Sequence, residues 1–122
     1  MTELIIFFLL LIKHVIADLG LQSQLLWGRS DEKNNYFGIG GHWHYLHHAI
    51  GSFLVFICFL DIHTTLLLAV LDYVAHWHID FTKHRINRYF NLVKKDIAWW
   101  WTATIDQILH FSTYFLLMWY II

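Results

Sequence analysis

Four long apolar segments take up most of the chain, and they constrain its fold more than any other feature. They cover about residues 4–27, 44–60, 62–81 and 99–122, which is 17 to 24 residues each. This length is close to the ~20 residues that an α-helix needs to cross the hydrocarbon core of a bilayer. Because backbone hydrogen bonds must be satisfied internally in lipid, such segments are expected to be helices. The sequence therefore predicts an all-α membrane protein, with residues 1–122 forming one integral membrane domain, a four-transmembrane-helix bundle.

The composition favours a membrane protein and excludes other classes. Hydrophobic residues make up 58% of the chain and charged residues 14%, whereas a soluble domain carries about a quarter charged residues. The net charge is -1 and no basic stripe is present, so no nucleic-acid partner is expected. Cys58 is the only cysteine and is predicted to be a small buried residue. The first segment lacks a positive start and a cleavage site, which favours a retained span over a signal peptide.

The lysines and arginines predict how the chain is oriented. Four spans return the C-terminus to the side of the N-terminus, and the segments on that side contain no lysine or arginine. Under the positive-inside rule the opposite, basic side is cytoplasmic and both termini lie outside, as expected for a bacterial inner-membrane protein. Seven of the eight basic residues lie on or beside the cytoplasmic side: Arg29, Lys33, Lys83, Arg85, Arg88, Lys94 and Lys95.

Every apolar segment also carries ionisable residues, many of them four positions apart. Residues with this spacing share one face of a helix. With a rise of ~1.5 Å per residue and alternating helix directions, the groups from all four spans fall into one slab, roughly 15–27 Å from the side of the termini. The bundle is therefore predicted to have a polar core displaced toward the cytoplasmic side. The residues of this slab are His14, Asp18, His44, His47, His48, Asp72, His76, Asp80, Asp106 and His110.

A metal ion is the partner that best accounts for such a slab. A carboxylate at the centre of a membrane helix costs at least ~2.5 kcal/mol, so it should face the interior and be paired. Imidazole and carboxylate together suit Zn, Mn or Fe, and pairs four apart offer two ligands to one ion. One or two divalent ions are predicted, with interhelical hydrogen bonding as the alternative role of the cluster. The predicted ligands are His14, Asp18, His47, His48, His76, Asp80, Asp106 and His110.

Four polar residues beside the slab are candidate substrate contacts. Lys83 and Arg85 lie where a phosphate at the cytoplasmic leaflet would be, and Gln22 and Gln107 flank predicted ligands. For Lys83 two other roles stay open, namely an ion pair with Asp80 or snorkelling to the interface.

Other residues are given local structural roles. Asp61 is predicted to cap the third helix after a polar turn at residues 61–65, and Gly51 to permit close helix packing. Residues 38–41, "GIGG", are predicted to form a flexible lead-in to the second span. Lys13 either snorkels or pairs with an inward carboxylate. His78 lies between two predicted ligands in sequence but is turned roughly 200° away from His76.

Four short motifs, in this order, resemble a known family, that of small bacterial and phage membrane proteins catalogued as domain of unknown function 3307. The motifs are "KHVIADLGLQ" with His14, Asp18 and Gln22, "HYLHH" with His44 to His48, "HWHIDFTK" with His76, Asp80 and Lys83, and "DQILH" with Asp106, Gln107 and His110. The resemblance spans nearly the whole chain and implies that the four motifs form one site. It implies no activity, because the family has none defined. By looser analogy the chain is similar to membrane-bound metal-dependent hydrolases, which use His and Asp from several spans.

The leading functional hypothesis is a metal-dependent hydrolase that acts on a lipid or a lipid-linked ester or phosphoester. A bound metal lowers the pKa of water to about 7 and so supplies a hydroxide nucleophile. Asp106 and Asp18 are the candidate catalytic carboxylates, with Asp106 as general base.

Two other hypotheses stay open. One is a di-iron oxygenase-like enzyme that uses the same ligands, and iron rather than zinc would favour it. The other is a non-enzymatic small membrane protein, whose cluster either holds the fold together or conducts metal ions or protons. Membrane lipid is the expected partner, and a homo-oligomer is compatible with the sequence.

Overall fold

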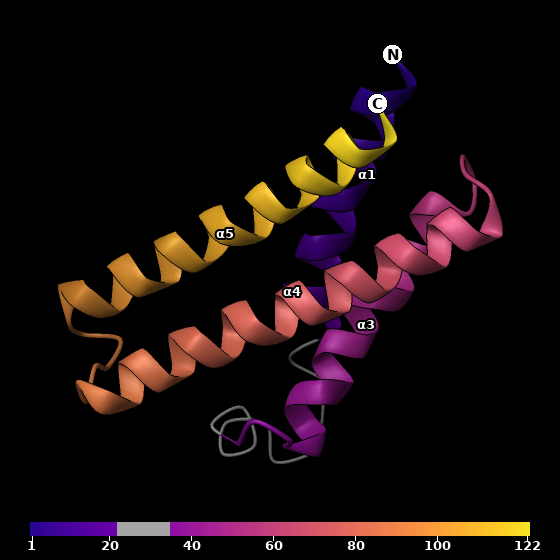
Figure 1. Ribbon diagram of the computed structural model, residues 1–122. Coiled ribbons are helices and arrows are strands. Elements are labelled where there is room, and N and C mark those ends of the chain that lie inside the picture. The colour runs from indigo at the N-terminus through magenta and orange to yellow at the C-terminus, as the bar shows by residue number, and fades with distance from the viewer. Residues whose placement is uncertain (22–34) are drawn as a thin grey trace.

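The chain folds into helices that pack as a bundle (Figure 1). The computed structural model describes residues 1–21 and 35–122, and within these residues it contains four α-helices and no strand. The helical segments are α1 (Thr2–Val15), the π-helix η1 (Ile16–Leu21) that continues it, α3 (Ile39–Phe56), α4 (Ile62–Tyr89) and α5 (Ile97–Ile121). The all-α prediction is confirmed. The predicted end of the first span, Gln22 to Trp27, lies outside the described residues.

The start of α3 differs from the sequence prediction. The helix begins at Ile39, after Gly38 as N-cap, so the glycine-rich segment is helix rather than a flexible lead-in. Gly40 and Gly41 are both buried. A Cβ atom on Gly41 would lie 3.1 Å from the hydroxyl of Tyr45. Gly41 therefore leaves room for the ring of Tyr45, one turn later in the same helix, which offsets the low helix propensity of glycine.

The third predicted span, about residues 62–81, and the polar residues that follow it form one continuous helix, α4, which ends at Tyr89. Asp61 is its N-cap, as predicted, and its side chain accepts hydrogen bonds from the backbone N–H groups of His63 and Thr64 at 2.9 and 3.1 Å. The helix already includes residues 62–65, so the polar turn predicted there is wrong. Because a capping carboxylate satisfies the free N–H groups, the helix can start directly after Asp61.

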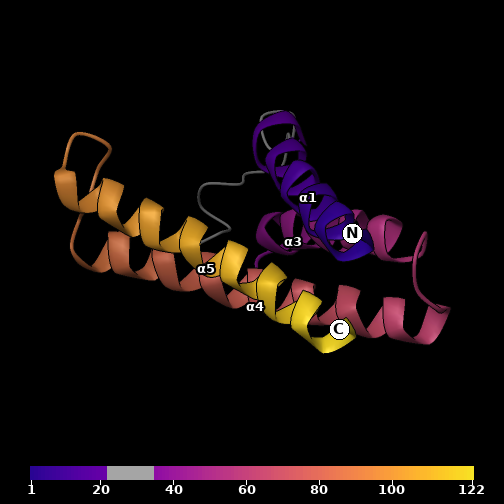
Figure 2. The ribbon, with the colours of Figure 1, turned by 90° about the horizontal axis from the view of Figure 1, so that it is seen from above.

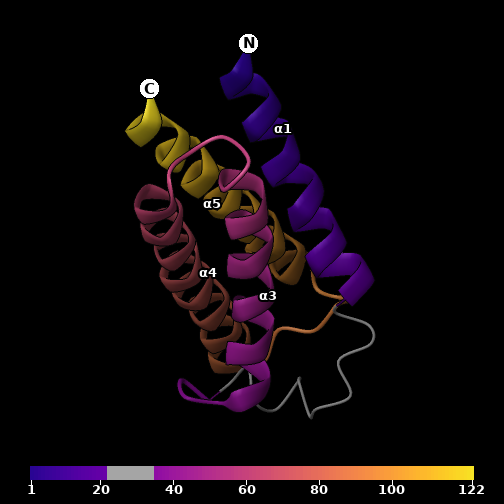
Figure 3. The ribbon, with the colours of Figure 1, turned by 90° about the vertical axis from the view of Figure 1, so that its right-hand side faces the viewer.

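The four helices form a ring. α3 packs on α4, α4 on α5, and α1 on both α3 and α5. α4 and α5 lie side by side and antiparallel, whereas α1 crosses them at an angle (Figure 2). Both termini and the α3–α4 connection lie at one end of the bundle, and the α4–α5 link and the start of α3 lie at the other (Figure 3). Successive helices therefore run in alternating directions, as was assumed when the polar residues were placed in one slab.

The interior of the ring has an apolar part and a polar part. The apolar part comprises Ile6, Leu10, Phe56, Leu68, Tyr114, Leu117 and Met118. Among the residues that the structure describes, eleven buried residues are polar or charged and eleven are hydrophobic, while large hydrophobic side chains are exposed on every helix. Cys58 is among the exposed residues, so the prediction that it is buried is wrong. It lies just beyond the end of α3.

Within residues 1–21 and 35–122, one helical stretch is long and apolar enough to cross a membrane. It is Thr2–Leu21, with a mean hydropathy of 2.3. A signal sequence or the core helix of a soluble protein passes the same test, so the four-span arrangement stays a prediction.

Candidate metal centre

The structure brings polar side chains from η1, α3, α4 and α5 to one place inside the bundle. Asp18 comes from η1, His44 and His48 from α3, His76 and Asp80 from α4, and Asp106 and His110 from α5. All are buried except Asp18, whose side chain is 22% exposed. The predicted convergence of the four motifs is therefore seen in the structure.

Asp18 lies at the centre of the first group of donors. Its Oδ1 atom is 3.1 Å from Nε2 of His48 and 3.4 Å from Nε2 of His44. His76 completes the group, because one donor atom from each of the four residues lies within 4.8 Å of all the others. Three imidazoles and one carboxylate are a donor set that suits a tetrahedral zinc ion, and also iron.

A second group adjoins the first and consists of His76, Asp80 and His110, whose donor atoms also lie within 4.8 Å of one another. Asp80 connects the two groups: its Oδ1 is 3.4 Å from Nε2 of His110, and its Oδ2 is 3.5 Å from Nε2 of His44. A site with three protein ligands leaves a coordination position for water or substrate. The two groups can therefore hold one ion each, or share one.

His76 belongs to both groups and is the residue that most favours a metal. Its ring stacks between those of His48 and His110, at centroid distances of 3.7 and 3.9 Å. Both of its ring nitrogens are buried, and neither has a hydrogen-bond partner among the described residues. A buried polar atom without a partner costs ~1–3 kcal/mol. Coordination to a metal would remove this cost at the nitrogen that binds the ion.

His14, a predicted ligand, lies beside the first group but is not one of its donors. Its Nε2 is 3.2 Å from both Asp18 Oδ2 and Gln107 Oε1, and its Nδ1 is 2.8 Å from the hydroxyl of Tyr114. Since both neighbours of Nε2 are acceptors, Nε2 carries the proton and Nδ1 accepts from Tyr114. His14 thus orients the carboxylate of Asp18, as the outer partners of metal sites do.

Asp106 also lies outside both groups. Its Oδ2 accepts hydrogen bonds from Lys83 Nζ at 2.8 Å and from Gln107 Nε2 at 3.3 Å. Its Oδ1 is buried, lies 3.6 Å from Nε2 of His110, and has no hydrogen-bond partner in the described part of the chain. One oxygen of this carboxylate is therefore anchored while the other faces the second group.

A comparison with family models adds to this geometry. A model described as "Protein of unknown function (DUF3307)" matches residues 6–122. The chain belongs to this family. The match covers every residue of both donor groups, and it confirms the resemblance seen in the four motifs. No curated protein and no solved structure matches the chain.

Within this member of the DUF3307 family, His44 takes the place that the sequence analysis gave to His47. His47 is only partly buried, and its Nδ1 lies 2.8 Å from the backbone oxygen of Trp43 on its own helix. His44 and His48 are four residues apart and share one face, whereas His47 is displaced by about 100° from His48. The structure therefore does not bring His47 to the centre.

Two further residues, His78 and Arg85, lie away from both donor groups. His78 is exposed and its two ring nitrogens lie 2.7 Å from Val74 O and 3.0 Å from the Tyr36 hydroxyl. Arg85 is exposed on the α4 extension. Gln22 lies outside the described residues. Tyr114 was missed by the sequence analysis, although its position one turn after His110 placed it on the same helix face.

A separate polar cluster, Lys13–Asp72–Ser52, lies next to the centre. Lys13 Nζ donates to Asp72 Oδ2 at 2.7 Å and to the backbone oxygen of His48 at 3.0 Å. The hydroxyl of Ser52 donates to the same oxygen of Asp72 at 2.6 Å. Of the two roles left open for Lys13, pairing with an inward carboxylate is the one observed. The stem of Lys13 also packs over Gly51, where a Cβ would lie 3.2 Å from its Cδ, so Gly51 permits close packing as predicted.

Proposed function

We propose that the protein is an integral membrane metalloprotein, and that it acts as a metal-dependent hydrolase on a lipid or a lipid-linked ester or phosphoester. The observation that carries the proposal is the buried, unpartnered pair of ring nitrogens of His76 among the described residues, at the point shared by two donor groups. One or two ions of Zn, Mn or Fe suit these donors.

The distribution of side chains supports a membrane location. Large hydrophobic residues are exposed on all four helices while charged groups are buried among them, which is the arrangement expected when the surrounding solvent is lipid. In this proposal all four helices span the bilayer. The α4–α5 link with Lys94 and Lys95 then lies in the cytoplasm, and both termini lie outside.

The proposed chemistry assigns a part to each carboxylate. A divalent ion at the donor groups would activate water, because it lowers the pKa of bound water to about 7. Asp106 is positioned to accept the proton through its unbonded Oδ1, while Lys83 fixes its other oxygen. The water oxygen adds to the carbonyl carbon or phosphorus of the substrate. The bond to the alcohol oxygen breaks, and the alcohol leaves with the proton that Asp106 returns.

A structural role is the second candidate. It is favoured by Asp18, whose two oxygens already have three imidazole nitrogens within 3.4 Å of them. Such contacts could hold α1, η1 and α3 together as interhelical hydrogen bonds. This alternative does not account for the two unpartnered nitrogens of His76.

The test uses full-length protein purified in a neutral detergent without chelators and supplied with lipid carboxyl esters and lipid phosphoesters. We expect hydrolysis of one class, with a rate that falls at least about a hundredfold in Asp106→Asn because general-base catalysis contributes that much. The metal content of Asp106→Asn should be unchanged, and Asp96→Asn, at the start of the same helix, should retain full activity. If metal-loaded protein hydrolyses neither class, the hydrolase proposal is wrong.

A further inference from the structure

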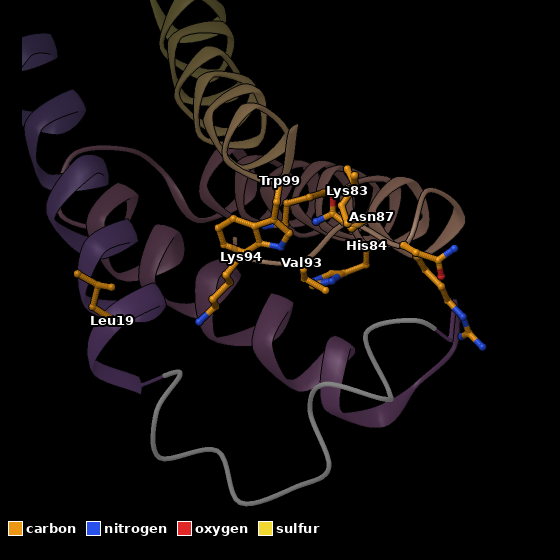
Figure 4. Close-up of a pocket in the computed structure, with 10 residues that line it drawn as sticks. Leu19, Lys83, His84, Asn87, Val93, Lys94 and Trp99 are labelled. Atoms are coloured by element: carbon orange, nitrogen blue, oxygen red, sulfur yellow. The ribbon is translucent and has the colours of Figure 1, made fainter. Parts of the chain in front are cut away.

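A cavity of about 840 Å³ opens at the end of the bundle that holds the α4–α5 link. It is bounded by the last turns of α4, the link at residues 90–96 and the first turn of α5, with Leu19 of η1 on its far side (Figure 4). In the proposed topology this end faces the cytoplasmic headgroups.

The lining of the cavity is basic. It includes Lys83, His84, Arg88 and Lys94, and none of the described residues that line it is acidic. Arg88 and Lys94 have no carboxylate partner within the described part of the chain. No carboxylate of the described residues therefore neutralises their positive charge, and a cavity of this kind attracts anions.

Asn87 adds uncharged donors to this wall. Its Oδ1 accepts a hydrogen bond from the hydroxyl of Thr102 at 2.7 Å. The side-chain NH₂ group of Asn87 is thereby turned toward other acceptors, and Asn87 lines the cavity. Guanidinium, ammonium and amide donors together match the oxygens of a phosphate group.

Lys83 connects the cavity with the candidate metal centre. It lines the cavity, and its Nζ atom lies 2.8 Å from Asp106 Oδ2 and 3.6 Å from Asp80 Oδ1. An anion held in the cavity therefore lies next to Lys83. On its other side, Lys83 contacts Asp106, the proposed general base, and Asp80 of the second donor group.

The same cavity also has an apolar side, made by Leu19, Leu92, Val93 and Trp99. A small hydrophilic anion gains no binding energy from these apolar side chains, whereas an amphiphile can pack its hydrocarbon chain against them. Trp99 stands at the start of α5, where a tryptophan is typical of the headgroup level of a bilayer.

We propose that this cavity binds the phosphate group of the substrate, which makes the substrate a phosphate ester carried on an amphiphile. This inference deepens the proposed hydrolase function and rests on it. It also corrects the sequence-based assignment of a phosphate contact to Arg85. That residue does not line the cavity, and Arg88, three positions later, does.

The test measures the binding of dihexanoyl phosphatidate and of inorganic phosphate by calorimetry, using metal-depleted full-length protein in a neutral, phosphate-free detergent. The chain offers two matched pairs of variants. Arg88→Gln and Lys94→Gln change cavity residues, while Arg85→Gln and Lys95→Gln remove the same charges from residues that do not line the cavity. We expect each cavity variant to weaken phosphatidate binding about tenfold, as for loss of a charge-assisted hydrogen bond, and each control to change it less than about twofold.

The outcomes separate the sources of the phosphate. Binding of phosphatidate alone, with the expected variant pattern, identifies a lipid headgroup. If inorganic phosphate binds equally well and the variants change its binding in the same pattern, the cavity recognises the phosphate group alone. This result supports the anion site and contradicts the proposal that the substrate is an amphiphile. If all four variants weaken binding alike, or if wild-type protein binds neither ligand, the cavity is not a phosphate site. Because the protein is metal-depleted, this result stands apart from the hydrolysis test: phosphate binding without hydrolysis in metal-loaded protein would contradict only the proposed catalysis.

Discussion

Two polar clusters lie side by side in the same bundle. They differ in whether their buried polar groups find hydrogen-bond partners among the cluster's own residues. In the Lys13–Asp72–Ser52 cluster, the carboxylate of Asp72 accepts from an ammonium and a hydroxyl, and Lys13 has a further acceptor in His48 O. The candidate metal centre holds carboxylates among imidazoles, and both nitrogens of His76 have no partner in the described part of the chain.

This difference separates a structural role from a functional one. A buried charge with a full set of partners contributes to the fold and needs nothing further. A buried group left without a partner persists when a ligand completes it or when the cost serves a function. We therefore attribute a stabilising role to the Lys13–Asp72–Ser52 cluster and keep the proposed metal binding for the His/Asp centre.

The largest effect is expected from breaking the satisfied cluster. Asp72→Ala leaves the ammonium of Lys13 buried without its carboxylate, and removing one partner of a buried pair costs about 3–5 kcal/mol. Unfolding by denaturant in detergent micelles, followed by circular dichroism, measures this loss.

The control for Asp72→Ala is the double variant Lys13→Met/Asp72→Leu, which removes both charges and restores packing. Replacing a buried ion pair by apolar residues is often neutral, so the double variant should be more stable than Asp72→Ala. If the two variants are equally unstable, the loss in Asp72→Ala does not come from leaving the ammonium of Lys13 buried without a partner.

The second effect is on metal binding. His76→Ala removes the donor shared by both groups, and the metal affinity should fall at least about a hundredfold, more than the loss of an outer partner costs. The matched control is His78→Ala, two residues later and exposed, which should bind metal like the wild type. Metal affinity is measured by competition with a chelating dye, with helix content checked in each variant. Equal affinity in both variants would remove His76 from the site.

A smaller effect is expected from Tyr114→Phe. The hydroxyl of Tyr114 donates to His14, which in turn orients Asp18, and loss of such an outer hydrogen bond typically reduces metal affinity about tenfold. Tyr73→Phe removes a comparable hydroxyl that lies 2.6 Å from His42 Nδ1, away from the centre. The same dye competition should show no change for Tyr73→Phe, and a similar decrease in both variants would mean that the effect is not transmitted through His14.

The smallest effect concerns the cap of α4, which belongs to neither cluster. Hydrogen bonds from the side chain and backbone of Thr64, and from the backbone of His63, hold the pKa of Asp61 below its usual value. Because the folded pKa is depressed, the stabilisation from this cap is complete above the unfolded pKa and is lost as the pH falls through the folded pKa. Asp61→Asn should remove this part of the acid-dependent change in Tm while leaving the metal affinity unchanged. An unaltered pH profile would contradict the role of the ionised cap.

The sequence predicted much of the fold and of the site. Hydrophobic segment length predicted the helices, and the four-residue spacing predicted that Asp18, His48, His76 and His110 meet. Helix periodicity fixes which residues share a face, and depth counting fixes their level.

Other features depended on tertiary packing and were not predictable in this way. The choice between His44 and His47 depends on the rotation of α3 about its axis, which the close packing of Lys13 from α1 over Gly51 helps to set. The assignment of His14 to a supporting role depends on Tyr114, which reads as an ordinary apolar residue in its segment. The basic cavity needs Arg88 and Lys94 together, and these meet only because the link at residues 90–96 folds back beside α4.

Elemental analysis of the full-length protein, purified in detergent without any chelator, tests the central claim most directly. The account predicts one or two equivalents of a divalent Zn, Mn or Fe ion per chain, with the ion lost in His76→Ala and retained in Asp72→Leu paired with Lys13→Met. Wild-type protein that is folded, contains no stoichiometric metal and takes up none of these ions would contradict it.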